Sequence, residues 1–280
     1  MRIGLSFANL GPLASAEGAA ALGEACDAHG IESLWTVEHP VVPANYDSEY
    51  PYDSSGKMPI PTEWPFPDPL VWLTWVAAHT KKVRLGTGVL ILPLRNPVVL
   101  AKEIATLDAM SGGRVELGIG VGWLEEEFAA LGVPFERRGE RTDEYIEVLR
   151  ALWSPGPTSA AGPIVRFDDM VSSPDPVQSS VPIVVGGHSH AAARRAGRLG
   201  DGFFPGRQDD LAELVSTMRK TAREAGRDPD DIELTFAGSK SAEKRRQLED
   251  LGASRLVYGT PMVAPDEMNA AIERLLDAVT

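Results

Sequence analysis

Residues 84–123 read RLGTGVLILPLRNPVVLAKEIATLDAMSGGRVELGIGVGW, and this stretch decides the fold. Two of its segments, 84–89 and 114–120, alternate apolar residues with polar residues or glycine, and this period of two predicts strands. Between them, Asn96 can cap a helix with Pro97 at its first position, and a glycine pair follows the end of that helix. The stretch is therefore a β-α-β unit, which requires parallel strands and a right-handed crossover.

Both strands end in glycines, at Gly86 and Gly88 in the first and at Gly118 and Gly120 in the second. A strand gains nothing from glycine, so such positions mark a bend, a bulge or a close approach of the backbone to another group. Two adjacent strands that both end this way indicate a flat group lying across the carboxyl end of the sheet. The alternative is packing alone, with the strands bending around a helix.

Two charged side chains occupy equivalent places in these strands. Arg84 and Glu116 alternate with apolar residues that face the helices, so both are expected to lie on the opposite face of the sheet, which is the interior if the sheet closes into a barrel. Burial of either charge alone would cost several kcal/mol, which favours pairing. A salt bridge between Arg84 and Glu116 is therefore predicted.

The same reasoning predicts eight strands in all, each followed by a helix. A (β/α)₈ TIM barrel fits this count and the length of 280 residues. An open, doubly wound sheet is the alternative, and it is disfavoured because the usual early G-x-G-x-x-G fingerprint is absent. The predicted strands are residues 2–8, 31–36, 84–89, 114–120, 182–186, 201–205, 232–237 and 254–259.

Two irregular segments interrupt this alternation. Residues 37–68 are rich in proline and aromatic residues. A loop of this length is either functional or disordered, and its aromatic residues argue against disorder. Residues 154–181 contain a short extended piece at 164–169 and are expected to pass over the surface of the barrel. No break in composition separates two domains, so residues 1–280 are expected to form a single TIM-barrel domain.

The composition excludes several classes of partner. The net charge of −13, without a long run of lysine or arginine, argues against nucleic acid and anionic membranes, because both require a basic surface. The single cysteine, Cys26, excludes a disulfide within the chain and fits a reducing compartment, so a cytoplasmic protein is expected. No signal peptide is expected, because the first residues pass directly into a strand. No apolar run approaches the ~20 residues of a membrane span.

In a barrel, catalytic groups lie on the loops that follow the strands. Glu38 and His39 follow the second strand, and histidine suits general acid–base catalysis because it titrates near neutral pH. The alternative is a loop histidine that is hydrogen-bonded to the backbone. Glu38 either orients the imidazole or is solvated. The other candidates at strand ends are Thr87, Gly88, Val89, Gly120, Gly122, Trp123, Gly186, Gly187, His188, Ser189, Phe204 and Arg207.

The sequence Gly186-Gly187-His188-Ser189 joins a strand to a helix. The backbone N–H groups at the start of a helix have no partner within that helix, so such a terminus suits a phosphate group. An ordinary turn is the alternative.

Motifs for other chemistries are absent from the sequence. The five histidines show no H-x-x-E-H or H-E-x-x-H spacing, and one cysteine gives no C-x-x-C, so no metal site is predicted. Neither G-x-S-x-G nor a P-loop occurs.

Several blocks follow one another in a recognisable order: LGTGVLILPLRNPVVLAKEIATLDAMSGGRVELGIGVGW, GVPFERRGERTDEYIEVLRALW, PDPVQ, VPIVVGGHS and RLGDGFFP. Together they resemble the bacterial luciferase-like monooxygenase superfamily, and in particular its branch of probable coenzyme F420-dependent oxidoreductases. The resemblance covers roughly residues 1–210, and the last seventy residues add little.

The resemblance carries implications for fold, cofactor and site. Members of this family are TIM barrels, often dimers, that bind FMN or the deazaflavin coenzyme F420 at the carboxyl end of the barrel. A homodimer is therefore implied, together with a non-proline cis peptide, here Gly88–Val89, behind the flavin ring. Gly186–His188 would hold the cofactor phosphate. His39 matches the acid–base histidine of deazaflavin enzymes, with Glu38 at a neighbouring acidic position.

One position departs from a subgroup of this family. In the sugar-phosphate dehydrogenases a glutamate follows the glycines of the fourth strand and acts as a proton donor. This chain has Trp123 there, followed by Leu124 and Glu125. A sugar-phosphate substrate is therefore disfavoured, and Trp123 is expected to pack on the flavin ring or on the substrate.

The leading hypothesis is an oxidoreductase that transfers a hydride between F420 and a small organic substrate under the 37–68 loop, with His39 handling a proton. The alternative enzyme is an FMN-dependent luciferase-like monooxygenase that uses molecular oxygen. A hypothesis of another class is a non-catalytic flavin-binding protein. The residues leave the cofactor open, because FMN and F420 share a tricyclic ring and a phosphate.

Overall fold

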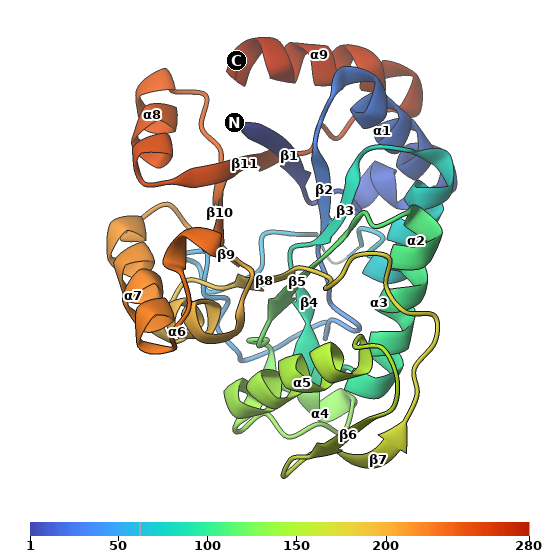
Figure 1. Cartoon of the computed structure of the whole chain (residues 1–280). Helices are drawn as coiled ribbons and strands as arrows, with labels where there is room; N and C mark the ends of the chain where they lie inside the picture. The colour runs from blue at the N-terminus through green and yellow to red at the C-terminus, as the bar shows by residue number, and fades with distance from the viewer. Residues whose placement is uncertain (62, 280) are drawn as a thin grey trace.

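The computed structural model describes residues 1–61 and 63–279, and a ring of parallel strands forms its centre (Figure 1). Each strand pairs in parallel with both neighbours, and the pairings of β3 with β5 and of β11 with β1 close the ring. The predicted (β/α)₈ TIM barrel is confirmed, and the open sheet is wrong. Around the ring, the strands are β1 (Arg2–Ser6), β2 (Ser33–Thr36), β3 (Arg84–Thr87), β5 (Val115–Gly120), β8 (Ile183–Gly186), β9 (Gly202–Phe204), β10 (Glu233–Ala237) and β11 (Ala253–Gly259).

The α-helices lie around the outside of the barrel (Figure 1). The helix between β3 and β5 begins as predicted, because the Asn96 side chain accepts hydrogen bonds from the backbone N–H groups of Val98 and Val99. The helices are α1 (Ala16–His29), α2 (Pro69–His79), α3 (Pro97–Ser111), α4 (Glu125–Ala130), α5 (Arg138–Leu152), α6 (His190–Leu199), α7 (Leu211–Glu224), α8 (Ala242–Asp250) and α9 (Met268–Val279).

The segment 154–181 contains an antiparallel hairpin of β6 (Thr158–Ala161) and β7 (Arg166–Met170). The sequence predicted only the second of these strands. The first was missed because its sequence, Thr158-Ser159-Ala160-Ala161, does not alternate apolar with polar residues. Short elements complete the chain: β4 (Leu90–Ile91) and the 3₁₀ turns Gly11–Ala14, Leu92–Leu94, Pro229–Asp231 and Pro265–Glu267.

A tryptophan fills the interior of the barrel beside the strand glycines. Trp35 on β2 is fully buried, and its indole N–H donates to the Ser33 hydroxyl at 2.9 Å. A Cβ atom at Gly86 would lie 2.7 Å from the indole, and one at Gly118 would lie 1.7 Å from the carbonyl oxygen of Thr87. Gly86 and Gly118 therefore make room for the chain's own aromatic ring and backbone. The close approach at these two glycines is to Trp35 and to the backbone of β3, and not to a helix as the packing alternative assumed.

A cluster of paired charges lies near the amino ends of the strands. The predicted salt bridge between Arg84 and Glu116 is confirmed. The sequence did not indicate its central member, Arg255 on β11, which is fully buried. Its guanidinium donates to both carboxylate oxygens of Glu116, at 3.0 and 2.8 Å, and to both of Glu32, at 2.7 and 2.8 Å. The same guanidinium lies 5.1 Å from the centre of the Trp35 ring.

Candidate active site

The candidate residues after β3, β5 and β8 meet at the carboxyl end of the barrel. The peptide bond Gly88–Val89 is cis, as the family resemblance implied. A Cβ atom at Gly120 or at Gly186 would lie 2.6 or 2.4 Å from the Val89 side chain, so Val89 lies across both glycines. Thr87 is buried and its hydroxyl donates to the carbonyl oxygen of Gly118 at 2.6 Å, which ties β3 to β5.

His39 pairs with a carboxylate that the sequence analysis did not identify. Its Nδ1 lies 3.0 Å from Oε2 of Glu127 on α4, and the Glu127 side chain is fully buried. The other Glu127 oxygen, Oε1, accepts from the backbone N–H of Val41 at 3.3 Å. The alternative of a histidine hydrogen-bonded to the backbone is therefore wrong for Nδ1.

Glu38 neither orients His39 nor is solvated, so both sequence-based alternatives for it are wrong. Its buried carboxylate accepts from Nε of Arg95 at 2.9 Å and from the backbone N–H of Ile91 at 2.5 Å. Burial raises the pKa of Glu38, and the Arg95 guanidinium opposes that shift. Successive side chains of an extended segment point in opposite directions, which is why Glu38 and His39 have different partners.

The 37–68 loop is closed at its base by two side chains that the sequence analysis also missed. Arg95 contacts Glu38 at the start of the loop and donates to Asp68 at its end, at 2.6 Å. The buried amide of Asn9, just after β1, donates to the carbonyl oxygens of Val37 at 2.9 Å and of Pro67 at 3.2 Å. The two ends of the loop are thereby held together.

Helix α4 also holds the middle of this loop. Glu126 accepts from the backbone N–H groups of Asp47 at 2.7 Å and of Ser48 at 3.2 Å, and from the Ser48 hydroxyl at 2.7 Å. The hydrogen bond from the Ser48 hydroxyl contributes most to lowering the pKa of Glu126 to about 2. The adjacent carboxylates Glu126 and Glu127 thus position the loop and His39, respectively.

An aromatic cluster covers His39. Trp123 makes edge-to-face contacts with His39, Tyr46 and Tyr50, with ring centres 5.6, 5.5 and 5.2 Å apart. Phe66 contacts the imidazole in the same manner at 5.9 Å. Trp123 therefore links the loop to the barrel end, and its packing on a cofactor or substrate stays a prediction.

Gly187 shapes the turn between β8 and α6. Its φ of 115° is a backbone conformation that residues other than glycine rarely adopt. Ser189 caps α6 by accepting from the backbone N–H of Ala192 at 3.2 Å. Tyr52 of the loop lies against this turn, because its hydroxyl oxygen is 3.9 Å from where a Cβ atom of Gly187 would be. Its ring also lies 2.6 Å from where a Cβ atom of Gly206 would be.

The His188 side chain forms a hydrogen bond within the protein. Its Nδ1 accepts from the backbone N–H of Arg207 at 3.3 Å, and burial lowers the pKa of His188. The neutral ring therefore carries its proton on Nε2, which is buried without a hydrogen bond and lies 3.7 Å from Oδ1 of Asp209. The imidazole thus holds the β9–α7 loop, while the backbone of His188 forms part of the turn.

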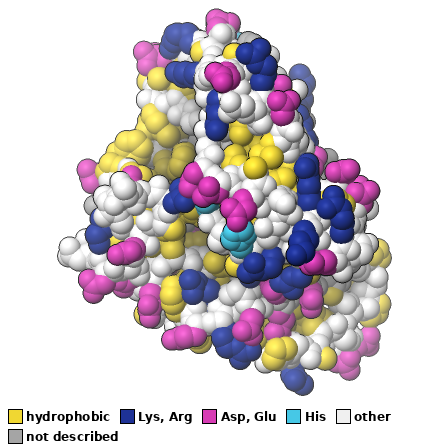
Figure 2. Space-filling view, turned by 90° about the vertical axis from the view of Figure 1, so that its left-hand side faces the viewer, with side chains coloured by type: hydrophobic (Ala, Val, Ile, Leu, Met, Phe, Trp, Pro, Cys, Tyr) yellow, Lys and Arg dark blue, Asp and Glu magenta, His cyan; other side chains and the backbone are white. Residues whose placement is uncertain are grey.

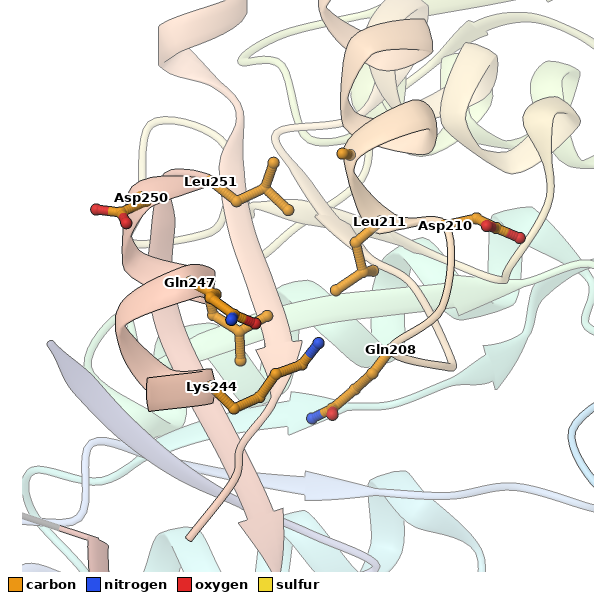
Figure 3. Close-up of a pocket in the computed structure, with 9 residues that line it drawn as sticks. Gln208, Asp210, Leu211, Lys244, Gln247, Asp250 and Leu251 are labelled. Atoms are coloured by element: carbon orange, nitrogen blue, oxygen red, sulfur yellow. The ribbon is translucent and has the colours of Figure 1, made fainter. Parts of the chain in front are cut away.

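A pocket of about 410 Å³ lies beside this loop, between α7 and α8 (Figure 3). Lys244 and Gln208 point into it from its two sides, and Leu211 and Leu251 form apolar walls. None of the candidate residues at the strand ends lines this pocket, so the predicted chemistry does not take place there.

The face formed by α6, α7 and α8 carries acidic and basic side chains side by side, with hydrophobic side chains visible in its hollows (Figure 2). Within residues 1–61 and 63–279, every helix is too short or too polar to cross a membrane. In the same residues, no three His, Cys, Asp or Glu side chains are grouped so that they could hold a metal ion.

Comparison with known proteins gives a match over most of the chain. Residues 4–274 match the family model described as luciferase-like monooxygenase. An uncharacterised protein of Mycobacterium tuberculosis is 31% identical over 258 residues, which is 91% of this chain and 92% of the relative. The F420-dependent glucose-6-phosphate dehydrogenase of Kineococcus radiotolerans is 37% identical over 178 residues, 61% of this chain and 52% of the relative. The solved structure of the monooxygenase RslO1 from Streptomyces bottropensis has a TM-score of 0.66 and 27% identity, and the match covers 100% of this chain and 80% of that chain.

These relatives include both a dehydrogenase that depends on F420 and a monooxygenase, so they share oxidation–reduction chemistry but differ in the reaction. The family match extends from the first strand of the barrel to the last helix, well beyond the region of the sequence blocks. The chain belongs to the luciferase-like monooxygenase family and is an oxidoreductase of that family.

Proposed function

We propose that this enzyme transfers a hydride between coenzyme F420 and a small organic substrate, with His39 exchanging a proton with that substrate. The observation that carries the proposal is the pairing of His39 with the buried Glu127 at the carboxyl end of the barrel. A relative that is 37% identical over part of the chain depends on F420, which supports this cofactor. Trp123 stands where the family's sugar-phosphate dehydrogenases have a glutamate, so we propose a substrate other than a sugar phosphate.

The turn Gly186–Ser189 would hold the cofactor phosphate through its backbone N–H groups. Two observations fit such an anion: the turn opens α6, and Gly187 lets the backbone adopt a φ of 115° there without a side chain in the way. When bound, the deazaflavin supplies hydride transfer and, unlike FMN, no reaction with oxygen. Thr87, Gly88, Val89, Gly120, Gly122 and Trp123 would form the remainder of the cofactor site.

The second candidate is an FMN-dependent monooxygenase, which the similarity to RslO1 favours at 27% identity over the full chain. The same turn would hold the phosphate of FMN. A flavin-binding protein without turnover is disfavoured, because it would have no use for a histidine held by a fully buried carboxylate.

The two reactions differ in their need for oxygen. We expect the reduced deazaflavin to be oxidised in the presence of a panel of small ketones, aldehydes and enones, at the same rate in anaerobic and in air-saturated buffer. The absorbance of the deazaflavin and the concentration of dissolved oxygen would be recorded together. A reaction that proceeds with FMN, stops without oxygen and consumes oxygen in step with the substrate would contradict the proposal.

We also propose that the enzyme is a homodimer that pairs through α2 and the start of α3, which lie side by side in Figure 1. Large apolar side chains are exposed there, with Val71 71% and Trp75 46% exposed on α2, and Val98 and Val99 42% and 55% exposed on α3. A shallow apolar hollow of about 390 Å³ is bordered by Val71, Thr74, Trp75 and Ala78. Exposed apolar surface of this extent is typical of a protein–protein interface.

Replacing Val71 with glutamate is expected to raise the dissociation constant of the dimer by roughly tenfold or more, because an unpaired charge would be buried. Analytical ultracentrifugation over a range of concentrations measures this constant. Val171→Glu is the matched control, since Val171 is 67% exposed on the other irregular segment. A wild type that sediments as a monomer, or a Val71→Glu protein that dimerises as tightly as the control, would contradict the proposed interface.

A further inference from the structure

We propose that Glu127 is a positioning residue, which fixes the tautomer of His39 and stabilises its protonated form during turnover. This inference rests on the proposed function for its catalytic consequence, whereas the tautomer itself is a property of the protein without cofactor or substrate. Nothing in the sequence pattern distinguished Glu127 from its neighbours Glu125 and Glu126, so the assignment comes from its contacts alone.

The hydrogen bonds of Glu127 determine which imidazole nitrogen carries the proton. Both carboxylate oxygens act as acceptors: Oε1 faces the backbone N–H of Val41 at 3.3 Å, and Oε2 faces Nδ1 of His39 at 3.0 Å. An ionised carboxylate can only accept, so the hydrogen of the neutral imidazole must be on Nδ1. Nε2 is then left with a free lone pair, and it makes no hydrogen bond with the described residues. It is therefore the atom that can take a proton from a substrate.

Among the described residues around His39, Glu127 is the one acidic side chain in contact with the ring. Trp123 and Phe66 contact the ring with their edges and carry no charge. Glu38, the adjacent residue, is bound to Arg95. In the described part of the chain, no other acidic side chain lies within ion-pair distance of the His39 ring. The carboxylate would stay hydrogen-bonded to Nδ1, and would pair with the charge of the ring, when Nε2 takes a proton.

The hydrogen bond from the Val41 N–H to Glu127 predicts how the side chain would be oriented in Glu127→Gln. In Glu127→Gln, the backbone N–H of Val41 still needs an acceptor, so the amide oxygen is expected to face Val41. The NH₂ group then faces His39 and donates to Nδ1. The imidazole hydrogen must move to Nε2, and a protonated Nε2 has no lone pair with which to act as a base. The variant should therefore retain its fold and lose the active tautomer.

The tautomer can be measured by nitrogen NMR on ¹⁵N-histidine-labelled protein without cofactor, with the His39 signals assigned through a His39→Gln variant. We expect Nδ1–H in the wild type and in Glu125→Gln, an exposed position on the same helix, and Nε2–H in Glu127→Gln. A wild type that carries Nε2–H, or a Glu127→Gln protein with the wild-type tautomer, would overturn the inference. The wild-type spectrum alone is a test if the variant does not fold.

The catalytic consequence is measured separately. In the direction of substrate oxidation, with oxidised F420 and the reduced form of a compound that the wild type turns over, Glu127→Gln is expected to lower kcat by about 100-fold or more with little change in KM, since general base catalysis contributes about 10²–10⁴-fold. An unchanged kcat in a variant with the inverted tautomer would overturn the role of Glu127 in turnover. If the wild type turns over no compound with F420, the proposed function fails, while the tautomer result still stands or falls by itself.

Discussion

Replacing His39 with alanine is expected to lower turnover by about 10²–10⁴-fold while leaving the affinity for the cofactor unchanged. The reason is that the imidazole is held at the carboxyl end of the barrel by Glu127, whereas the groups proposed to hold the phosphate lie on the β8–α6 turn. Steady-state kinetics on the substrate found in the oxygen test, together with a cofactor titration, measure the two effects.

A matched control is His29→Ala, at the end of α1, which should have wild-type kinetics. Turnover of His39→Ala within a fewfold of the wild type would remove this residue from the mechanism. A parallel loss of cofactor binding would assign His39 a role in holding the cofactor in place of proton transfer.

Replacing Arg255 with methionine is expected to lower the free energy of unfolding by about 3–5 kcal/mol, because removing one partner of a buried ion pair leaves an uncompensated charge. Here two carboxylates, Glu32 and Glu116, would lose four hydrogen bonds from one guanidinium. Urea unfolding followed by circular dichroism measures this loss, provided that the transition is two-state.

The partly exposed partner in the same cluster provides the control. Arg84→Met removes a cation that is 27% exposed, so its loss should be clearly smaller than that of Arg255→Met. Adding Glu116→Gln and Glu32→Gln to Arg255→Met should restore part of the stability, because the unpaired charges are then absent. Equal losses for Arg84→Met and Arg255→Met would contradict the central position of Arg255.

The barrel could be predicted because its signals are local. Each signal depends on only a few neighbouring residues. These signals are the alternation in 84–89 and 114–120, the cap Asn96 and the glycines after the helices. The pairing of Arg84 with Glu116 followed from strand phase. The position of Arg255 in the same cluster did not, because 139 residues separate it from Glu116, and only the closed ring of strands brings them together.

The positions of the candidate residues in the fold could be predicted in outline for the same reason. Barrel topology places strand ends together, so His39 and the turn after β8 could be expected on one face. The partner of His39 was missed because Glu125, Glu126 and Glu127 form a run in the first turn of α4, where acidic residues are common without any special contact. Only the packing of α4 against the loop separates Glu127 from the other two.

The long loop gave the fewest signals. Its proline and aromatic content indicated a folded loop, but not the anchors Asn9 and Arg95 that hold its two ends. Its aromatic residues meet Trp123 and the β8–α6 turn, so the shape of the proposed site depends on contacts between segments far apart in the chain. Such contacts leave no periodicity in a sequence.

F420 and FMN imply different reactions, so the relative affinity of the protein for these two cofactors decides between them. The purified protein, freed of small molecules, would be titrated side by side with F420 and with FMN, with binding followed by fluorescence and by equilibrium dialysis. We expect saturable, one-to-one binding of F420 that is clearly tighter than that of FMN. Tight binding of FMN with no detectable binding of F420 would contradict this expectation.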